Sequence, residues 1–293
     1  MDNLEDWKKA GELTSKARAF GKEKIKIGVS LLKVTEEIED FIYENGGKPA
    51  FPVQISVNNI AAHFNPSKDD EYIFRKGDLV KLDLGVHVNG CIGDTAISVD
   101  LGDNKELISA SEEALKEAIK IVKPGVKLRE IGKVIEKTIT GKGFKPVRNL
   151  TGHEIKKYEE HAGMTIPNFD NGDETQLVEG QVIAIEPFAT NGVGFIDEGK
   201  DSEIYKLLEE KTSRDMIARN VLMKIIKEYK VLPFAKRWLF KDFPEFKVNY
   251  ALRLLEREKI LHRYEQLVER DNGLVSQTEH TLLVQENPLI LTK

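Results

Sequence analysis

The sequence predicts an α+β fold whose two halves are related by an approximate twofold axis. Two observations support this: helical periodicity gives way to strand patterns twice along the chain, and each half repeats motifs of the other. Residues 28–39 (GVSLLKVTEEIE) match residues 125–136 (GVKLREIGKVIE) at an offset of 97, and residues 77–83 (GDLVKLD) match residues 180–186 (GQVIAIE) at an offset of 103. Such a repeat indicates two copies of one unit, so we expect one curved antiparallel sheet with helices covering its outer face.

Each half reads as two amphipathic helices followed by paired strands. In the first half we expect helices over residues 3–25 and 29–45, the second of which stops at Gly46. In the second half, helices over residues 104–122 and 127–140 repeat this order. The apolar face of each helix would pack against the sheet.

Residues 81–96 (KLDLGVHVNGCIGDTA) read as a β-hairpin that carries two aspartates. Residues 89–90, Asn-Gly, suit a type I′ turn. If they form the loop, Asp94 faces Gly85, and Asp83 lies two residues further along on the same face. Two buried carboxylates this close require a positive charge between them. A solvated edge strand is the alternative interpretation of an isolated aspartate pair.

Carboxylates also end both copies of the repeated strand motif, which weakens that alternative. Asp83 and Glu186 each lie six residues after the glycine that opens an apolar strand. Glu279 interrupts a later strand, within a hairpin expected over residues 272–292, and His153 lies beside a glycine turn. Four carboxylates and one imidazole suit two divalent ions of the Mn, Fe, Co or Zn kind. The candidate ligands are Asp83, Asp94, His153, Glu186 and Glu279.

Between Glu186 and Glu279 the sequence pattern changes from strands to helices. From residue 206 to residue 270 the pattern is helical, and Leu261 and Leu267 fall on its last expected helix. This segment has 16 Lys and Arg against 10 Asp and Glu, a net charge of +6, while the remainder carries −11. We therefore expect an inserted helical subdomain at residues 206–270 and a main domain formed by residues 1–205 and 271–293.

Composition excludes several classes of protein. The net charge of −5 argues against a protein that coats nucleic acid as a whole, and we expect no DNA partner. The single cysteine, Cys91, excludes an intramolecular disulfide. The N-terminus, MDNLEDWKKAGEL, is charged where a signal peptide needs an apolar core, and no apolar run reaches membrane-spanning length. We expect a cytoplasmic protein without a membrane partner.

Six motifs resemble those of the type 2 methionine aminopeptidases, a family with the pita-bread fold. In order they are AFPVQISVNNIAAHFNP, VKLDLGVHVNGCIGDTA, NLTGHEI, HAGMTIPN, AIEPFAT and QTEHTLL. The likeness runs from the N-terminal helices through residue 293. It implies a winged-helix-like insertion, and the lack of a long N-terminal extension is similar to archaeal members. It also implies that Asp83, Asp94, His153, Glu186 and Glu279 bind two metal ions, with Asp94 and Glu279 as the bridging pair.

The resemblance further implies an activity. Family members remove the N-terminal initiator methionine from nascent proteins when the second residue is small. A hydroxide held by two divalent ions would attack the scissile amide, and Glu186 would take up the proton of the water. His63 and His161 resemble two histidines that hydrogen-bond the scissile amide. Phe51 resembles a wall of the methionine pocket. The family also suggests a monomer.

Three alternatives remain open at this stage. Prolidase and aminopeptidase P share the ligand set, but they usually carry a separate N-terminal domain, and only 82 residues precede Asp83 here. A pita-bread protein without catalysis would act as a binding scaffold, against which the five intact ligands argue. The basic insertion suits transient contact with the ribosome, or it is a solvated helical appendage. The ligand set accepts Co, Mn, Fe or Zn, so it does not fix the metal.

Overall fold

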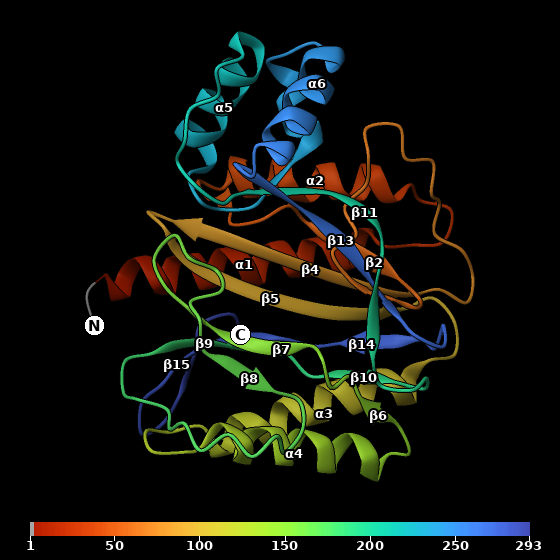
Figure 1. Ribbon diagram of the computed structural model, residues 1–293. Coiled ribbons are helices and arrows are strands. Elements are labelled where there is room, and N and C mark those ends of the chain that lie inside the picture. The colour runs from red at the N-terminus through yellow and green to blue at the C-terminus, as the bar shows by residue number, and fades with distance from the viewer. Residues whose placement is uncertain (1–2) are drawn as a thin grey trace.

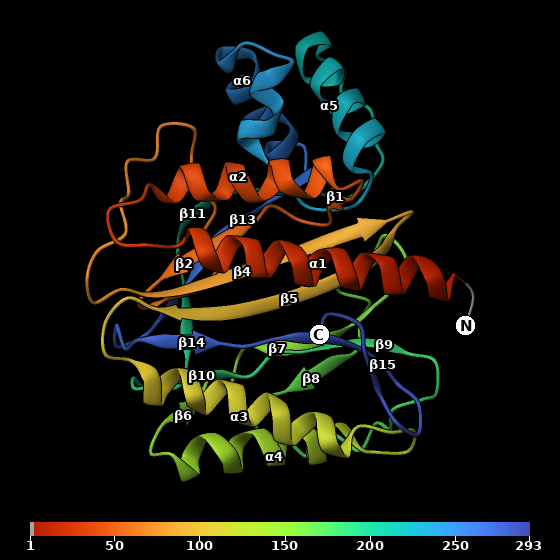
Figure 2. The same ribbon diagram turned by 180° about the vertical axis from the view of Figure 1, so that it is seen from behind.

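Helices from both halves of the chain cover one side of the strands. The computed structural model describes residues 3–293, so the first two residues of the expected range 1–205 lie outside it. The helices are α1 (Leu4–Lys24), α2 (Leu31–Glu44), α3 (Lys105–Ile121), α4 (Leu128–Gly141), α5 (Met216–Tyr229) and α6 (Glu245–Arg257), with a 3-10 helix η1 (Lys236–Lys241). Helices α1, α2 and α3 lie in front of the strands in Figure 2. In both views α5 and α6 lie above α2 (Figures 1 and 2).

The strands pair antiparallel throughout and form four hydrogen-bonded sheets, in the orders β1-β4-β2 with β5 beside β4, β14-β10-β6, β12-β11-β13-β3 and β16-β15-β9-β7-β8. The strands are β1 (Lys48–Pro49), β2 (Gln54–Val57), β3 (Ile60–Ala62), β4 (Leu79–Val88), β5 (Cys91–Asp100), β6 (Lys145–Pro146), β7 (Thr151–Ile155), β8 (Thr165–Pro167), β9 (Val182–Ile185), β10 (Phe188–Thr190), β11 (Ile196–Leu207), β12 (Phe234–Ala235), β13 (Leu261–Glu269), β14 (Val275–Gln277), β15 (His280–Leu283) and β16 (Leu289–Ile290).

The structure confirms the predicted α+β fold with two related halves. Helices α2 and α4 begin at residues 31 and 128, and strands β1 and β6 begin at residues 48 and 145, which keeps the offset of 97. Strands β4 and β9 begin at residues 79 and 182, which keeps the offset of 103. The loops before α2 and α4 carry Gly28 and Gly125, both at φ 86°, a backbone conformation that glycine adopts without strain. The repeated sequence therefore encodes repeated geometry.

Matching apolar positions explain why α2 and α4 form as they do. Each helix buries side chains at positions 1, 4, 8 and 12, the spacing that places residues on one face of an α-helix. These are Leu31, Val34, Ile38 and Ile42 in α2, and Leu128, Ile131, Ile135 and Ile139 in α4. The first set belongs to the core under α1 and α2, and the second to the core under α3 and α4. One helix face thus anchors each half to its strands.

The predicted hairpin forms with the predicted register. Strand β4 pairs with β5 so that Val88 faces Cys91 and Gly85 faces Asp94. Asn89 and Gly90 have φ values of 52° and 90°, as a type I′ turn requires. Asp83 and Asp94 consequently lie on the same face of the strand pair, within the interior of the molecule.

The insertion contains more strand than the sequence analysis predicts. The expectation that Leu261 and Leu267 lie on a helix is wrong, because residues 261–269 form β13, which pairs with β11 and β3. Helix α6 ends at Arg257, and Lys259 then adopts a left-handed φ of 56°. The six-residue spacing of the two leucines is a multiple of the strand period of two, so it suits one face of a strand. The domain boundaries at residues 206 and 270 remain a prediction.

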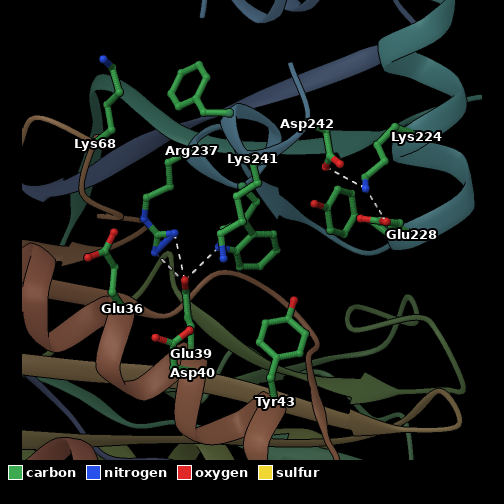
Figure 3. A pocket seen from close by; sticks show the side chains of 13 residues that line it. Glu36, Glu39, Asp40, Tyr43, Lys68, Lys224, Glu228, Arg237, Lys241 and Asp242 are labelled. Carbon is green, nitrogen blue, oxygen red and sulfur yellow. Dashed lines mark hydrogen bonds and ion pairs between the residues drawn. The ribbon is translucent and has the colours of Figure 1, made fainter. Parts of the chain in front are cut away.

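A buried ion pair joins the insertion to α2. Arg237 of η1 donates two hydrogen bonds to Glu39 of α2, at 2.6 and 2.9 Å, and the indole Nε1 of Trp238 donates a third at 2.8 Å. The Arg237 and Glu39 side chains are only 5% and 7% exposed. Figure 3 shows this contact at the base of a cleft of about 840 Å³ between α2, α5 and η1. A desolvated charge pair therefore adds to the β13–β3 pairing that attaches the insertion to the main domain.

Candidate metal centre

Every site residue that the sequence analysis selects lines one small pocket of about 80 Å³. Both halves of the chain contribute to its walls. The five candidate ligands come from β4, β5, β7, the turn after β9 and the turn between β14 and β15. These strands meet in the middle of the molecule in Figure 1. The residues are Phe51, His63, Asp83, Asp94, His153, His161, Glu186 and Glu279.

Hydrogen bonds fix the segment around Glu279 beside strand β5. The expected hairpin over residues 272–292 forms only as the β15–β16 pair, since β14 pairs with β10. The backbone N–H of Asp94 donates to the hydroxyl of Thr281 at 2.8 Å, and that hydroxyl donates to the carbonyl of Asp94 at 2.8 Å. The N–H of Glu279 donates to the carbonyl of Ala96 at 3.0 Å. These contacts keep Asp94 and Glu279 close in space, although they lie 185 positions apart in the sequence.

The five candidate ligands line one pocket, and three of them are close enough to share one ion. Asp94, His153 and Glu279 offer ligand atoms that all lie within 4.8 Å of one another. The Nε2 atom of His153 lies 3.6 Å from Oδ2 of Asp94 and 3.5 Å from Oε1 of Glu186. Within the described chain, the buried Oδ1 atoms of Asp83 and Asp94 have no hydrogen-bond partner. Unpaired, desolvated carboxylate oxygens around an imidazole are the donor set that divalent transition metals take.

Gln277 connects two of the candidate ligands. Its side-chain Nε2 donates to Oδ2 of Asp83 at 3.2 Å and to Oε2 of Glu186 at 3.4 Å. Asp83 and Glu186 are the two carboxylates that the internal repeat relates, so Gln277 bridges the twofold axis. Gln277 has no predicted role, because it lies outside both copies of the internal repeat. Its place two residues before Glu279 in QTEHTLL is the one available signal.

Burial makes ionised carboxylates costly in this pocket. Desolvation raises the pKa of Asp83 to about 7. Desolvation, and then repulsion by neighbouring carboxylates, raises the pKa values of Asp94, Glu186 and Glu279 well above the ordinary range. The described pocket lining contains no Lys or Arg that could compensate the charge. Bound cations would keep all four groups ionised, so the electrostatics fit the predicted metal centre.

These pKa shifts predict how the stability of the metal-free protein depends on pH. A carboxyl whose pKa is higher in the folded chain stabilises the fold fully below its unfolded pKa of about 4, and this stabilisation is lost as pH rises through the folded value. In excess chelator we expect Tm to fall by roughly 5 °C between about pH 5 and pH 8. Thermal unfolding followed by circular dichroism measures this change. Asp83→Asn should reduce the fall, and an unchanged or rising Tm would contradict the assignment.

The two non-ligand histidines both line the pocket. His63, at φ 65°, places its Nδ1 3.1 Å from the backbone carbonyl of Glu265, and its ring meets Tyr264 edge-on. The ring of His161 lies 4.1 Å from that of His153, between centroids. Burial lowers the pKa values of His63 and His161 to about 4. Both imidazoles are therefore neutral at physiological pH. His63 donates its one N–H, on Nδ1, to the Glu265 carbonyl, so its Nε2 can accept a hydrogen bond from a substrate N–H, whereas His161 can donate its N–H to a substrate oxygen.

Apolar groups form the remaining wall of the pocket. Phe51 is almost fully buried, and its ring occupies the space that a side chain at Gly85 would need. The same wall includes Ala62, Leu150 and Phe188. A glycine at position 85 on β4 therefore lets an aromatic ring approach the carboxylates directly. This wall suits an apolar side chain of a substrate.

Sequence comparisons place the chain among metallopeptidases. The profile of Metallopeptidase family M24 matches residues 5–286. A methionine aminopeptidase of Archaeoglobus fulgidus is 48% identical over 283 residues, which cover 97% of this chain and 96% of the relative. No helix in residues 3–293 combines the length and apolar character needed to cross a membrane.

Solved structures share the fold. The methionine aminopeptidase of Thermotoga maritima superposes with a TM-score of 0.71 and 25% identity, covering 99% of this chain and 96% of that one. The prolidase of Pyrococcus furiosus gives a TM-score of 0.64 and 21% identity, and it covers 100% of this chain but only 64% of its own. The prolidase likeness shows a common fold alone. The chain therefore spans nearly all of this methionine aminopeptidase and about two thirds of this prolidase.

Proposed function

This chain belongs to metallopeptidase family M24 and has the pita-bread fold, and we propose that it is a type 2 methionine aminopeptidase. It would remove the N-terminal initiator methionine from nascent proteins whose second residue is small. The observation that supports this most strongly is the convergence of four buried carboxylates and His153 in a pocket with an apolar wall. The ligands suit metal-assisted hydrolysis, and the wall suits a thioether side chain.

Asp83, Asp94, His153, Glu186 and Glu279 would hold two divalent ions of Co, Mn, Fe or Zn, with Asp94 and Glu279 shared between the ions. When bound, the ions would lower the pKa of a water toward neutrality and polarise the scissile carbonyl. Gln277 supports this arrangement, because its hydrogen bonds to Asp83 and Glu186 orient both carboxylates.

Glu186 would act as the general base and then as the acid. Its carboxylate lies between Gln277 and His153, so it is fixed on both sides. It would take the proton of the attacking water and pass a proton to the nitrogen of the leaving amine, which keeps the number of protons balanced. Its burial keeps competing solvent away from the transferred proton.

His63 and His161 would stabilise the reacting amide. The neutral His63 donates its Nδ1–H to the Glu265 carbonyl, so its Nε2 would accept a hydrogen bond from the N–H of the scissile amide, whereas the neutral His161 can direct its N–H at the substrate. An N–H directed at the carbonyl oxygen would stabilise the negative charge that develops there. Phe51 would contact the methionine side chain and favour an unbranched thioether.

The substrate partner would be a peptide or the N-terminus of a nascent protein. We propose that the protein acts as a monomer in the cytoplasm and contacts the ribosome transiently through the insertion. The net charge of +6 on residues 206–270 supports this contact, since it contrasts with −11 on the remainder and would be attracted by RNA phosphates. Co-sedimentation with ribosomes tests it, using charge reversal at the exposed Arg219, Lys227 and Arg253. Equal sedimentation of both forms would reject the contact.

The proposed activity is tested by methionine release. Chelated protein is reconstituted with Mn, Co, Fe or Zn and offered Met-Gly-Ser and Xaa-Pro peptides in parallel. We expect metal-dependent release of methionine and no cleavage of Xaa-Pro. Cleavage of Xaa-Pro alone would favour a prolidase-like activity, and failure to cleave either peptide would favour a binding scaffold.

A further inference from the structure

Glu160 is a fifth carboxylate in the pocket, and the proposed reaction gives it no role. It lies on the loop between β7 and β8 and lines the same cavity as the candidate ligands. Its side chain is only 10% exposed. In the described chain its one side-chain partner is His161, whose Nε2 lies 3.7 Å from Oε1 of Glu160. A desolvated carboxylate without a cation or a close donor is costly for the fold and points to a ligand.

Its chain neighbour His161 places Glu160 near the opening of the pocket. The side chains of Asp94, His153 and Glu186 are 3%, 7% and 12% exposed, whereas that of His161 is 50% exposed. The pocket therefore reaches solvent on the side of His161, next to Glu160 in the chain. At the same time Glu160 is close enough to the inner carboxylates to raise the pKa values of Asp83 and Asp94. Glu160 thus lies next to the candidate ligands and is followed in the chain by the solvent-exposed His161.

The charge balance leaves Glu160 uncompensated. Asp83, Asp94, Glu186 and Glu279 together carry four negative charges, which two divalent ions neutralise. Desolvation raises the pKa of Glu160 to about 7, and Lys206 of β11 opposes this rise without forming an ion pair with Glu160 in the described chain. Lys206 is also partly exposed, so solvent screens its field. A positive charge delivered by the substrate would complete the balance.

We propose that Glu160 is a specificity-determining residue that favours substrates with a positively charged side chain shortly after the scissile bond. The inference rests on the proposed function, which places the terminal methionine at the ligands. The rest of the peptide must then leave through the opening, past Glu160 and His161. Because the second residue is small, the third residue is the first that can carry a charge on a long side chain. Lys or Arg at the third position is the substrate class that Glu160 fits.

Matched peptides test this role. Met-Gly-Lys, Met-Gly-Gln and Met-Gly-Glu peptides of otherwise equal sequence are compared by kcat/KM at low ionic strength. We expect the unaltered enzyme to prefer Lys over Glu by roughly tenfold, as for partly screened charges within the pocket. Glu160→Gln should bring the ratio close to one, and Glu160→Asp, which retains the charge, should keep most of the preference.

Glu159→Gln is the matched control. It removes the same charge one residue away, where the side chain is exposed and does not line the pocket, and it should keep the tenfold preference. An unchanged ratio in Glu160→Gln, or an equal loss in both variants, would overturn the inference. Methionine release without charge preference in the unaltered enzyme would overturn this inference alone. Absence of release from every peptide would overturn the proposed function together with it.

Discussion

Glu186→Gln is expected to lower kcat by roughly three orders of magnitude while the protein remains folded. Glutamine is isosteric with glutamate but cannot accept the proton of the attacking water at neutral pH. Its amide also replaces an oxygen 3.5 Å from Nε2 of His153 or the oxygen that accepts from Gln277. Steady-state methionine release by the metal-loaded variant measures the effect, because kcat reports the chemistry once substrate is bound.

A control must distinguish a loss of proton transfer from a loss of bound metal ions. Metal content is determined on the same sample, so that the rate can be expressed per loaded site. Glu179→Gln is the matched variant: it lies seven residues earlier in the chain on an exposed loop and should retain full activity. A kcat for Glu186→Gln within tenfold of the unaltered enzyme, at equal metal content, would remove Glu186 from the proton-transfer role.

Arg237→Met is expected to lower the free energy of unfolding by about 3–5 kcal/mol. The substitution leaves Glu39 buried between α2 and the insertion with only the Trp238 indole as a side-chain donor. Burial raises the pKa of Glu39 to about 7 even beside Arg237, so loss of the guanidinium would favour the protonated acid. The destabilisation should therefore be larger at pH 8 than at pH 6. Urea unfolding midpoints at the two pH values measure it.

Two further variants show whether the loss of stability in Arg237→Met comes from the unpaired charge of Glu39. Arg257→Met removes an exposed arginine from the end of α6 and should cost less than about 0.5 kcal/mol. Replacing both buried partners, as in Glu39→Leu with Arg237→Met, should recover part of the loss, because no uncompensated charge remains. If Arg237→Met costs no more than Arg257→Met, the ion pair does not hold the insertion in place.

Local patterns were sufficient to predict the helices and the β4–β5 hairpin. Helical periodicity in residues 31–44 and 128–141, together with the glycines before them, defines α2 and α4 closely. The Asn-Gly turn fixes the register, and the register alone places Asp83 and Asp94 on one face. Strand β13 was missed because the whole of residues 206–270 was read as helical, although the six-residue spacing of Leu261 and Leu267 suits one face of a strand. Its pairing with β11 depends on contacts that are distant in the sequence.

The candidate site was predictable only in part for the same reason. The repeat pairs Asp83 with Glu186, and local features add Glu279 and His153, but only the family resemblance indicates which carboxylates are shared between the two ions. Gln277 and Glu160 belong to neither signal. Glu160 lies on a loop, where no periodicity distinguishes a buried carboxylate from the exposed Glu159 beside it. Only the tertiary structure shows that Glu160 enters the pocket.

Anomalous diffraction from a crystal soaked in Mn²⁺ tests the central claim most directly. If the pocket holds two metal ions, two anomalous peaks about 3.5–4 Å apart are expected within it. Both would lie against Asp94 and Glu279, with Asp83, His153 and Glu186 completing the contacts. Peaks confined to surface carboxylates, or ions held without Asp94 and Glu279, would contradict the dinuclear centre and the hydrolytic mechanism built on it.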